Sequence, residues 1–447
     1  MPRFEPLESG GGNWVCRIWV GVVIVVAAVL VGGAVFGTIT GFVVSDLAGC
    51  KNSYGTHVPT DPSAVVIAAY PDTGCAYPDR GVAGVLEPVD EGRVLYISNC
   101  HNLHLLHTVD PVAGSVASTA IPSNLPSITT ATDKLKFAAF DASSGKVYVS
   151  FLRHDDNGVG ASDVNAGSKL PNSGCVSLSI VVCAFDAAPL GSAPSATCAA
   201  LFDSESVDPA CGAMNMHATG GQLMVTATEL LLTVGDLLQE PSTAQDDASF
   251  WGKIWRAPLG KEPLERADFV MVSKGHRNPQ GLCPIATDDG TDLVLETEHG
   301  PMGGDEINVL DLGASAPANY GWPEVSYGDH YGGGVIPDTH APLYTEPVAF
   351  FAYNLVGPNG ITVCTSWDGY HVIGSLNGRR LYTLVLGADR KVARLDAVDM
   401  DYRIRSIAPL DDCAALLLAE PENGIQGPLI RVNTCGRNRL YGDPEHV

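Results

Sequence analysis

Between about residues 82 and 435, short apolar runs alternate with turn residues, and this alternation limits the fold more than any other feature of the chain. The runs are rich in aliphatic, β-branched and aromatic residues, as in Val94–Ile97, Val147–Phe151, Leu223–Thr228, Leu293–Thr297, Tyr370–Gly374 and Leu416–Leu418. Pairs typical of hairpin turns stand beside them, namely Ser144-Gly145, Gly220-Gly221, Asp289-Gly290, Asp368-Gly369 and Asn377-Gly378. With 49 Gly, 30 Pro and only 17% charged residues, the composition suits many short strands. We therefore expect an all-β fold.

The length of this region favours a single closed array of strands. Almost no long amphipathic helical pattern interrupts it, and a sheet that closes on itself leaves few exposed edges. Six blades of about 60 residues would fill it, although propeller repeats of about 40 to 50 residues are more usual. No strict repeat is visible. The expectation is a six-bladed β-propeller.

The segment from Ile18 to Val44 contains no charged side chain. A helix of that length exceeds the roughly 30 Å hydrocarbon core of a bilayer. Arg3 and Arg17 precede it and Lys51 follows, a weak positive-inside bias. We expect a cytoplasmic tail (1–17), one transmembrane helix acting as a signal-anchor (18–44), a stalk (45–80), an extracellular or periplasmic/luminal propeller (81–436) and a C-terminal tail (437–447).

Two alternatives for this N-terminal region stay open. A cleaved secretory signal has a shorter apolar core, usually about 7 to 15 residues. The stretch Leu47-Ala48-Gly49-Cys50 is similar to the lipobox of bacterial lipoproteins, in which the cysteine is lipidated after cleavage. A lipidated chain would be tethered to the same side of the membrane as an anchored one.

Cysteine usage points to an oxidising compartment. None of the cysteines after the apolar segment forms a C-x-x-C pair, so a zinc site is not expected. They are Cys50, Cys75, Cys100, Cys175, Cys183, Cys198, Cys211, Cys283, Cys364, Cys413 and Cys435. Their scatter after a membrane leader fits disulfides, and we expect at least one local bridge among Cys175, Cys183, Cys198 and Cys211.

The formal net charge of −24 argues against nucleic acid as a partner. A protein that binds the phosphate backbone needs a cationic surface to release counterions. A large net negative charge by itself mainly keeps a protein soluble.

Four segments stand out against the strand pattern. The first has His217-Ala218-Thr219-Gly220-Gly221-Gln222-Leu223 and then Asp236, and the second is Gly275-His276-Arg277-Asn278-Pro279-Gln280-Gly281-Leu282. The third has Glu298-His299-Gly300-Pro301, Gly304-Asp305-Glu306-Ile307-Asn308 and Asn319-Tyr320-Gly321-Trp322-Pro323, and the fourth is Arg403-Ile404-Arg405. In this order they resemble the glucose/sorbosone dehydrogenase family. That family comprises soluble aldose dehydrogenases that use pyrroloquinoline quinone (PQQ), with Hedgehog-interacting-protein-like relatives.

The resemblance implies a six-bladed propeller and a redox site. Oxidation at an anomeric carbon needs a base near neutral pKa at the hydroxyl. His217 matches that base, and Asp236 matches the carboxylate that orients it. Arg277 and Asn278 match residues that touch the quinone, where a fixed cation stabilises developing charge.

The resemblance also implies ligands for a metal ion and for the cofactor's carboxylates. The main-chain carbonyls of Gly300 and Pro301 match those that bind Ca²⁺, a cation that accepts such oxygens. Asp305 and Glu306 either serve a second, structural ion or cap a turn. Arg403 and Arg405 match the pair that clamps the cofactor's carboxylates. Each of these roles is an expectation, because the same residue types are common in proteins where they do not have such a role.

This chain departs from the family in four places, one of which is an enlarged loop at Ala314 to Ala318, before Asn319. Where the family commonly has Ser-Leu-Lys, it has Ser375-Leu376-Asn377, which removes a cation expected to contact the cofactor. Phe351 stands where a Trp is expected, and the segment from Leu135 to Phe140 matches poorly. These departures put cofactor affinity in doubt and leave the fold prediction unchanged.

The main functional hypothesis is a membrane-tethered enzyme that oxidises a sugar with PQQ and Ca²⁺ and passes electrons to an external acceptor. The alternative is a non-catalytic extracellular propeller that binds a protein or a glycan. A propeller hydrolase using the same Ca²⁺ is a third, weaker hypothesis.

Overall fold

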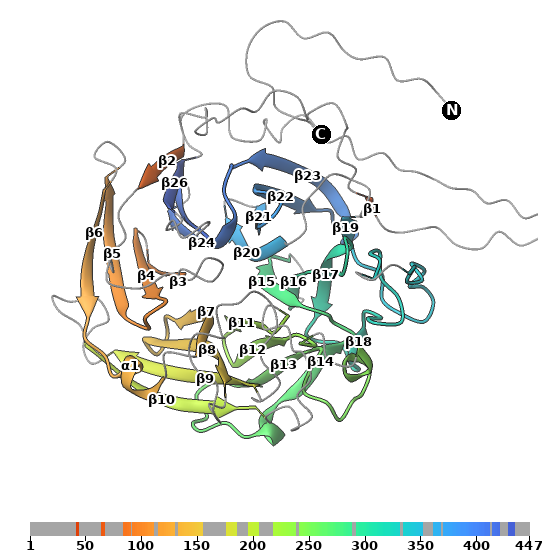
Figure 1. The fold of residues 1–447 in the computed structure, drawn as a ribbon, viewed down its shortest axis with the longest axis horizontal. Coiled ribbons are helices and arrows are strands. Elements are labelled where there is room, and N and C mark those ends of the chain that lie inside the picture. Colours follow the sequence, from red (N-terminus) through yellow and green to blue (C-terminus); the bar gives the residue numbers. More distant parts are fainter. Residues whose placement is uncertain are drawn as a thin grey trace, which may run out of the picture.

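The computed structural model describes residues 84–433 apart from 13 gaps, together with the short segments 42–43 and 64–67. The gaps are residues 91, 111–114, 130–132, 155–175, 186–194, 205–217, 238–240, 288–291, 331–333, 352–360, 368–369, 412–413 and 421–427. Within these residues, six antiparallel sheets are arranged as a ring of blades (Figure 1). The predicted all-β, six-bladed propeller is confirmed.

Each blade is a meander whose first strand lies nearest the axis, except that the last blade takes its outer strand from the N-terminal part of the chain. The inner strands are β3 (Gly84–Asp90), β7 (Lys134–Asp141), β11 (Gly220–Val225), β15 (Pro279–Ile285), β20 (Ile361–Trp367) and β24 (Ile404–Asp411). The second strands are β4 (Arg93–Ser98), β8 (Lys146–His154), β12 (Glu229–Val234), β16 (Leu293–Glu298), β21 (Tyr370–Ser375) and β25 (Ala414–Ala419).

The outer half of each blade completes the sheet. The third strands are β5 (Leu103–Asp110), β9 (Val176–Phe185), β13 (Lys253–Pro258), β17 (Asp305–Asp311), β22 (Arg380–Leu386) and β26 (Leu429–Asn433). The outermost are β6 (Ser115–Ile121), β10 (Ala196–Asp203), β14 (Val270–Lys274), β19 (Ala349–Phe351), β23 (Val392–Asp399) and β2 (Ala64–Ile67). Two short strands add parallel edges, β18 (Ala318–Asn319) on β14 and β1 (Phe42–Val43) on β19. The described helices are one turn or less: α1 (Leu125–Ile128) and two 3₁₀ turns, Pro241–Ala244 and Arg266–Asp268.

The ring is closed by a strand from the N-terminal part of the chain. β2 pairs antiparallel with β26, so the last blade combines β24, β25 and β26 with a strand that precedes the first blade. Residues 64–67, which we placed in the stalk, therefore belong to the propeller.

The hydrophobic core lies between blades. Six clusters of buried aliphatic and aromatic side chains each join two neighbouring blades. The second strands are buried on both faces, as β25 shows with all of its residues buried. This explains why their sequences read as continuous apolar runs rather than alternating ones.

Most of the predicted strand positions are confirmed, with one correction among the turns. Ser144-Gly145 and Asn377-Gly378 lie in tight turns between strands. Gly220 and Gly221 instead begin β11, both with positive φ, because they form a bulge rather than a hairpin turn.

Of the predicted transmembrane segment 18–44, the structure describes only the two residues of β1. Among the described residues there is no helix long and apolar enough to cross a membrane. The anchor and the extracytoplasmic location stay predictions.

Two disulfides join pairs of described cysteines, and the described Cys100 is also disulfide-bonded. Cys183–Cys198 joins β9 to β10 within the second blade, which confirms the expected local bridge. Cys283–Cys364 joins β15 to β20, the inner strands of two neighbouring blades. The second link could not be read from the sequence, because its cysteines are 81 residues apart.

Candidate active site

Bulges at one end of the inner strands organise the site. In β7, β11, β15, β20 and β24 the pairing with the second strand slips by one residue within the first few positions. Because successive blades repeat the same strand order around the axis, these five strand starts lie at the same end of the ring. A bulge turns side chains out of the sheet plane and is common beside active sites. The predicted residues Asn278 and Arg403 directly precede two of these strands, and Arg405 lies in the bulge of β24.

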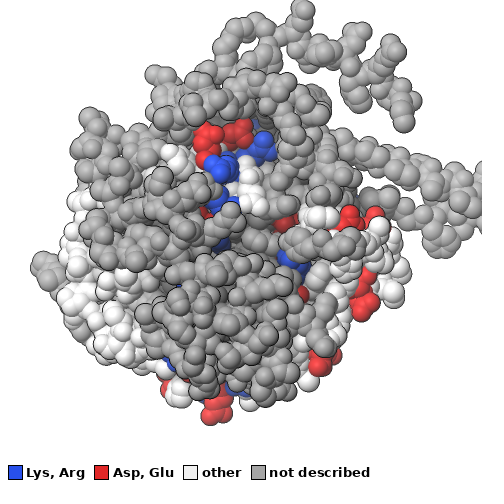
Figure 2. Space-filling model, viewed as in Figure 1, with Lys and Arg blue, Asp and Glu red and all other residues white. Residues whose placement is uncertain are grey.

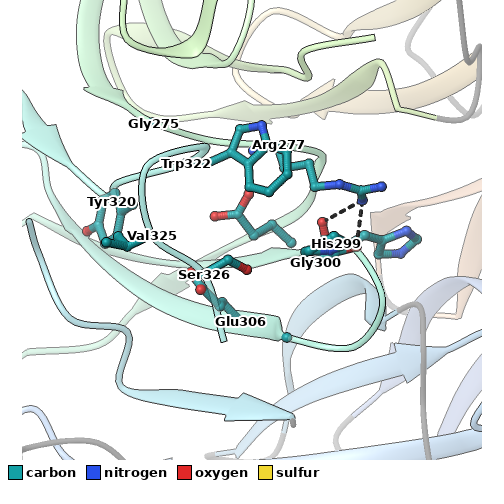
Figure 3. Close-up of a pocket in the computed structure, with 12 residues that line it drawn as sticks. Gly275, Arg277, His299, Gly300, Glu306, Tyr320, Trp322, Val325 and Ser326 are labelled. Carbon is teal, nitrogen blue, oxygen red and sulfur yellow. Dashed lines mark hydrogen bonds between the residues drawn. The ribbon is translucent and has the colours of Figure 1, made fainter. Parts of the chain in front are cut away.

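Arg277 is held in the pocket by main-chain oxygens. It precedes β15 and is only 5% exposed. Its Nη1 donates to the carbonyls of His299 at 3.0 Å and Gly300 at 2.6 Å (Figure 3). Its backbone N–H donates to Glu298 Oε2 at 2.9 Å. The guanidinium is thus fixed, buried and placed where the third and fourth blades meet, as a cation that stabilises developing charge would need to be.

Asp236 lies beside Arg277, at the end of β12. The carboxylate is 1% exposed, and Trp322 Nε1 donates to its Oδ2 at 2.7 Å. The backbone N–H of Asp236 donates to the Arg277 carbonyl at 2.9 Å. The Arg277 guanidinium carbon lies 5.7 Å from the centroid of the Trp322 ring. One indole therefore contacts both the predicted orienting carboxylate and the predicted electrophile.

His217, the predicted base, lies outside the described residues, and its contact with Asp236 stays a prediction. The described part of its motif begins at Ala218, and Gly220 N–H donates to Asn278 Oδ1 at 3.1 Å. Asn278 Oδ1 also accepts from Gln280 Nε2 at 2.8 Å. Two of the predicted segments, His-Ala-Thr-Gly-Gly and Arg-Asn-Pro-Gln, are thereby joined through Asn278.

A pocket of about 240 Å³, which includes open solvent, surrounds these groups (Figure 3). All of its lining except Val325 and Ser326 comes from the segments that the sequence singled out: Gly275, Arg277, Glu298, His299, Gly300, Pro301, Gly304, Glu306, Tyr320 and Trp322. Glycine is required at Gly300, because a Cβ there would lie 2.2 Å from the Gly304 carbonyl oxygen. The backbone of the predicted metal-binding loop is therefore tightly folded.

The predicted Ca²⁺ ligands are suitable oxygens, with one qualification from geometry. Gly300 and Pro301 both line the pocket, and carbonyl oxygens are a normal ligand type for Ca²⁺. The Gly300 carbonyl already accepts a hydrogen bond from Arg277, so a cation bound there would share it with the guanidinium or displace it. Asp305 Oδ1 accepts from the Gly300 N–H at 3.0 Å, which makes Asp305 a residue that caps this turn.

The sequence analysis did not identify a network of buried acidic residues, two of which, Glu298 and Glu306, also line the pocket. Asn308 Nδ2 donates to Glu296 Oε2 at 3.0 Å and to Glu298 Oε1 at 3.2 Å, and His276 Nδ1 lies 3.1 Å from the same Glu298 oxygen. Burial, and then repulsion from Glu298, raise the pKa of both Glu296 and Glu306 well above its ordinary value. His276, Glu296 and Glu298 offer ligand atoms within 4.8 Å of one another, a geometry that could also hold a metal ion. The sequence feature that could have revealed this network is the pair Glu296 and Glu298, two carboxylates inside an otherwise apolar strand.

Arg403 and Arg405 both contact the carboxylate of Glu420. Arg403 Nε donates to Glu420 Oε2 at 2.6 Å, and Arg405 Nη2 donates to Glu420 Oε1. Arg403 Nη1 also donates to Asn377 Oδ1, so the residue that replaces the expected lysine lies beside the clamp. Figure 2 shows Lys and Arg side chains, with acidic ones beside them, running from the region of β22 to β24 toward the centre of the ring.

Comparison with known proteins points to one family. The family model for glucose/sorbosone dehydrogenase matches residues 200–431, which contain all the segments described above. The chain belongs to the glucose/sorbosone dehydrogenase family. The family match begins within the second blade, and the earlier residues, including the poorly matching segment Leu135 to Phe140, lie outside it.

Two curated relatives match about half of the chain. An uncharacterized protein of Synechocystis is 31% identical over 207 residues, covering 42% of this chain and 47% of its own. The aldose sugar dehydrogenase YliI of Escherichia coli is 30% identical over 225 residues, covering 46% and 58%. The chain thus matches about half the length of these relatives.

Solved structures show the same fold over most of the chain. The PQQ-bound aldose sugar dehydrogenase of Streptomyces coelicolor is 21% identical, with a TM-score of 0.55, and the match covers 83% of this chain and 99% of that one. An oxidoreductase described as a putative glucose dehydrogenase from Thermus thermophilus is also 21% identical, with a TM-score of 0.54 and coverage of 80% and 98%. At this identity the likeness concerns the fold.

Proposed function

We propose that this protein oxidises the anomeric carbon of an aldose sugar with PQQ and Ca²⁺ and passes the electrons to an external acceptor. The observation that carries the proposal is the Arg277 guanidinium, fixed by two main-chain carbonyls beside the buried Asp236–Trp322 pair. Family membership supports it, as does the presence of PQQ in the similar Streptomyces structure.

The residues supply the groups that the chemistry needs. The sugar loses a hydride, which is a proton with two electrons, from its anomeric carbon. It also loses the proton of its anomeric hydroxyl. His217 would accept that proton, and Asp236, held by Trp322, would orient the imidazole. Arg277 would stabilise the negative charge that develops on the acceptor oxygen. When bound, PQQ would supply the hydride acceptor and Ca²⁺ would polarise it, and the main-chain carbonyls of Gly300 and Pro301 would hold the metal.

The site offers a reason for a polyanionic cofactor to bind. Arg405 Nε has no hydrogen-bond partner among the described residues, although it is buried. A buried donor left unpaired is costly, so a ligand that accepts from it is favoured. We also propose that residues 18–44 tether the propeller to a membrane, since this segment carries no charge.

The test is reconstitution of the purified protein with PQQ and CaCl₂, followed by dye reduction with a panel of aldoses. We expect turnover in the wild type, and a loss of about 10²- to 10⁴-fold in His217→Ala with PQQ binding retained. A wild type that neither binds PQQ in a titration nor reduces the dye would contradict the proposal and favour the non-catalytic binding propeller.

A further inference from the structure

Lys136 is a buried cation in the segment that matches the family poorly. It lies in the bulge of β7, between the paired positions Leu135 and Ala138, and is 8% exposed. The charged group that acts on it among the described residues is Arg405, and this interaction is repulsive. Lysine side chains are rarely buried to this extent.

The next blade is shaped to accept the Lys136 side chain. A Cβ on Gly221 would lie 2.9 Å from Lys136 Cβ and 3.2 Å from its Cγ, so the absence of a side chain at Gly221 leaves room for the lysine stem. Gly221 follows Gly220, whose N–H is bound by Asn278. Lys136 therefore packs against the β11 bulge, and Gly220 of the same bulge is bonded to the predicted quinone-contacting residue Asn278.

Lys136 faces the arginine clamp across the axis of the ring. β7 and β24 belong to blades separated by the first blade, so Lys136 and Arg405 can approach only through the central space. The neighbouring residue Phe137 also reaches across the ring, because it packs in the cluster between the fifth and sixth blades. Burial, and secondly Arg405, lower the pKa of Lys136 to about 7. Burial, and secondly Arg403, lower the pKa of Arg405 to about 9 despite its contact with Glu420.

The result is a group of three cationic side chains near the axis. Lys136, Arg403 and Arg405 converge there, and the carboxylate of Glu420 pairs with the two arginines. We propose that Lys136 is a binding residue for an anionic group of the axial ligand, namely a carboxylate of the cofactor if the proposed function holds. It replaces, from the opposite side of the axis, the positive charge that Asn377 removes beside Arg403.

The experiment compares PQQ binding by the wild type, Lys136→Met and Lys391→Met. Methionine keeps the length of the stem and removes the charge, and Lys391 is an exposed lysine in the turn between β22 and β23. Loss of one charge-assisted contact should weaken PQQ binding about 10- to 100-fold in Lys136→Met and leave Lys391→Met unchanged. Adding Asn377→Lys to Lys136→Met should recover much of the affinity, since it restores a cation to the clamp. Circular dichroism and the melting temperature of the ligand-free proteins check folding, and Lys136→Met should melt no lower than the wild type.

A parallel titration with citrate, a small tricarboxylate, separates this inference from the proposed function. Citrate binding that depends on Lys136, in a protein that does not bind PQQ, would support the anion site and reject the proposed cofactor. Equal PQQ affinity in the wild type and in folded Lys136→Met would overturn the role of Lys136 and leave the function standing. Failure to bind either anion would overturn both.

Discussion

At the scale of single residues, Trp322 connects the parts of the site. Its indole donates to Asp236 and lies beside the Arg277 guanidinium. The sequence placed Trp322 in a family motif but gave it no role, because its partners are 45 and 86 positions away in the chain. Asp236 and Arg277 were chosen from the sequence alone, and the structure brings them together.

Trp322→Phe should destabilise the protein more than Trp255→Phe. Trp255 Nε1 donates to the Phe250 carbonyl at 2.8 Å, so the control loses the same N–H group with a neutral acceptor. A hydrogen bond to a charged group contributes about 1.5 to 3 kcal/mol, and a neutral one about 0.5 to 1.5 kcal/mol. Urea unfolding would measure the difference, and equal losses would show that the Asp236 contact adds nothing special.

At the scale of elements, hydroxyl side chains opposite the bulges tie neighbouring blades together. Ser150, opposite the β7 bulge, donates to the Gly221 carbonyl of the next blade at 2.6 Å. Thr233 lies opposite the β11 bulge, and its hydroxyl donates to the Pro279 carbonyl of the fourth blade at 3.0 Å. The main-chain polar groups beside these two bulges thus have hydrogen-bond partners, and the bulges turn their residues toward the axis.

The pair β16–β17 carries a testable pH dependence. Because the pKa of Glu296 is raised in the folded state, the folded protein favours the protonated carboxyl. The contribution of the protonated Glu296 carboxyl to stability is fully present below its unfolded-state pKa of about 4.5. It is lost as the pH rises from there toward the folded-state pKa. Glu296→Gln, which cannot ionise, should therefore be more stable than the wild type at neutral and alkaline pH, with little difference at pH 4.

Denaturant unfolding at several pH values would measure this effect, with the exposed Glu324→Gln as control. The advantage of Glu296→Gln should grow by up to about 1.4 kcal/mol per pH unit between the two pKa values. A difference that does not change with pH would show that Glu296 does not titrate abnormally.

At the scale of the whole molecule, closure of the ring depends on four residues far from the last blade in sequence. β2 covers β26, which would otherwise present an open strand edge. The blade interfaces are continuous hydrophobic clusters, so loosening one blade exposes apolar surface on two sides.

Shortened chains would test this closure. A chain that begins at residue 60 keeps β2, whereas one that begins at residue 71 lacks it, and both lack the predicted membrane segment. We expect the shorter chain to lose about 2 to 4 kcal/mol of stability, from its missing strand hydrogen bonds. It should also associate in a concentration-dependent way through β26, as light scattering would show. Identical behaviour of the two chains would mean that β2 does not close the ring.

The sequence by itself determined the fold class, most strands and the residues of the candidate site. Local patterns carry this information, since turn pairs and buried runs reflect short-range preferences and the family motifs are contiguous. Only the tertiary structure decided which groups meet. The Glu296–Glu298–Asn308 network, the Cys283–Cys364 link and the approach of Lys136 to Arg405 each join different strands or blades. Such contacts depend on how the ring closes and where its bulges fall, and no local pattern in the chain encodes them.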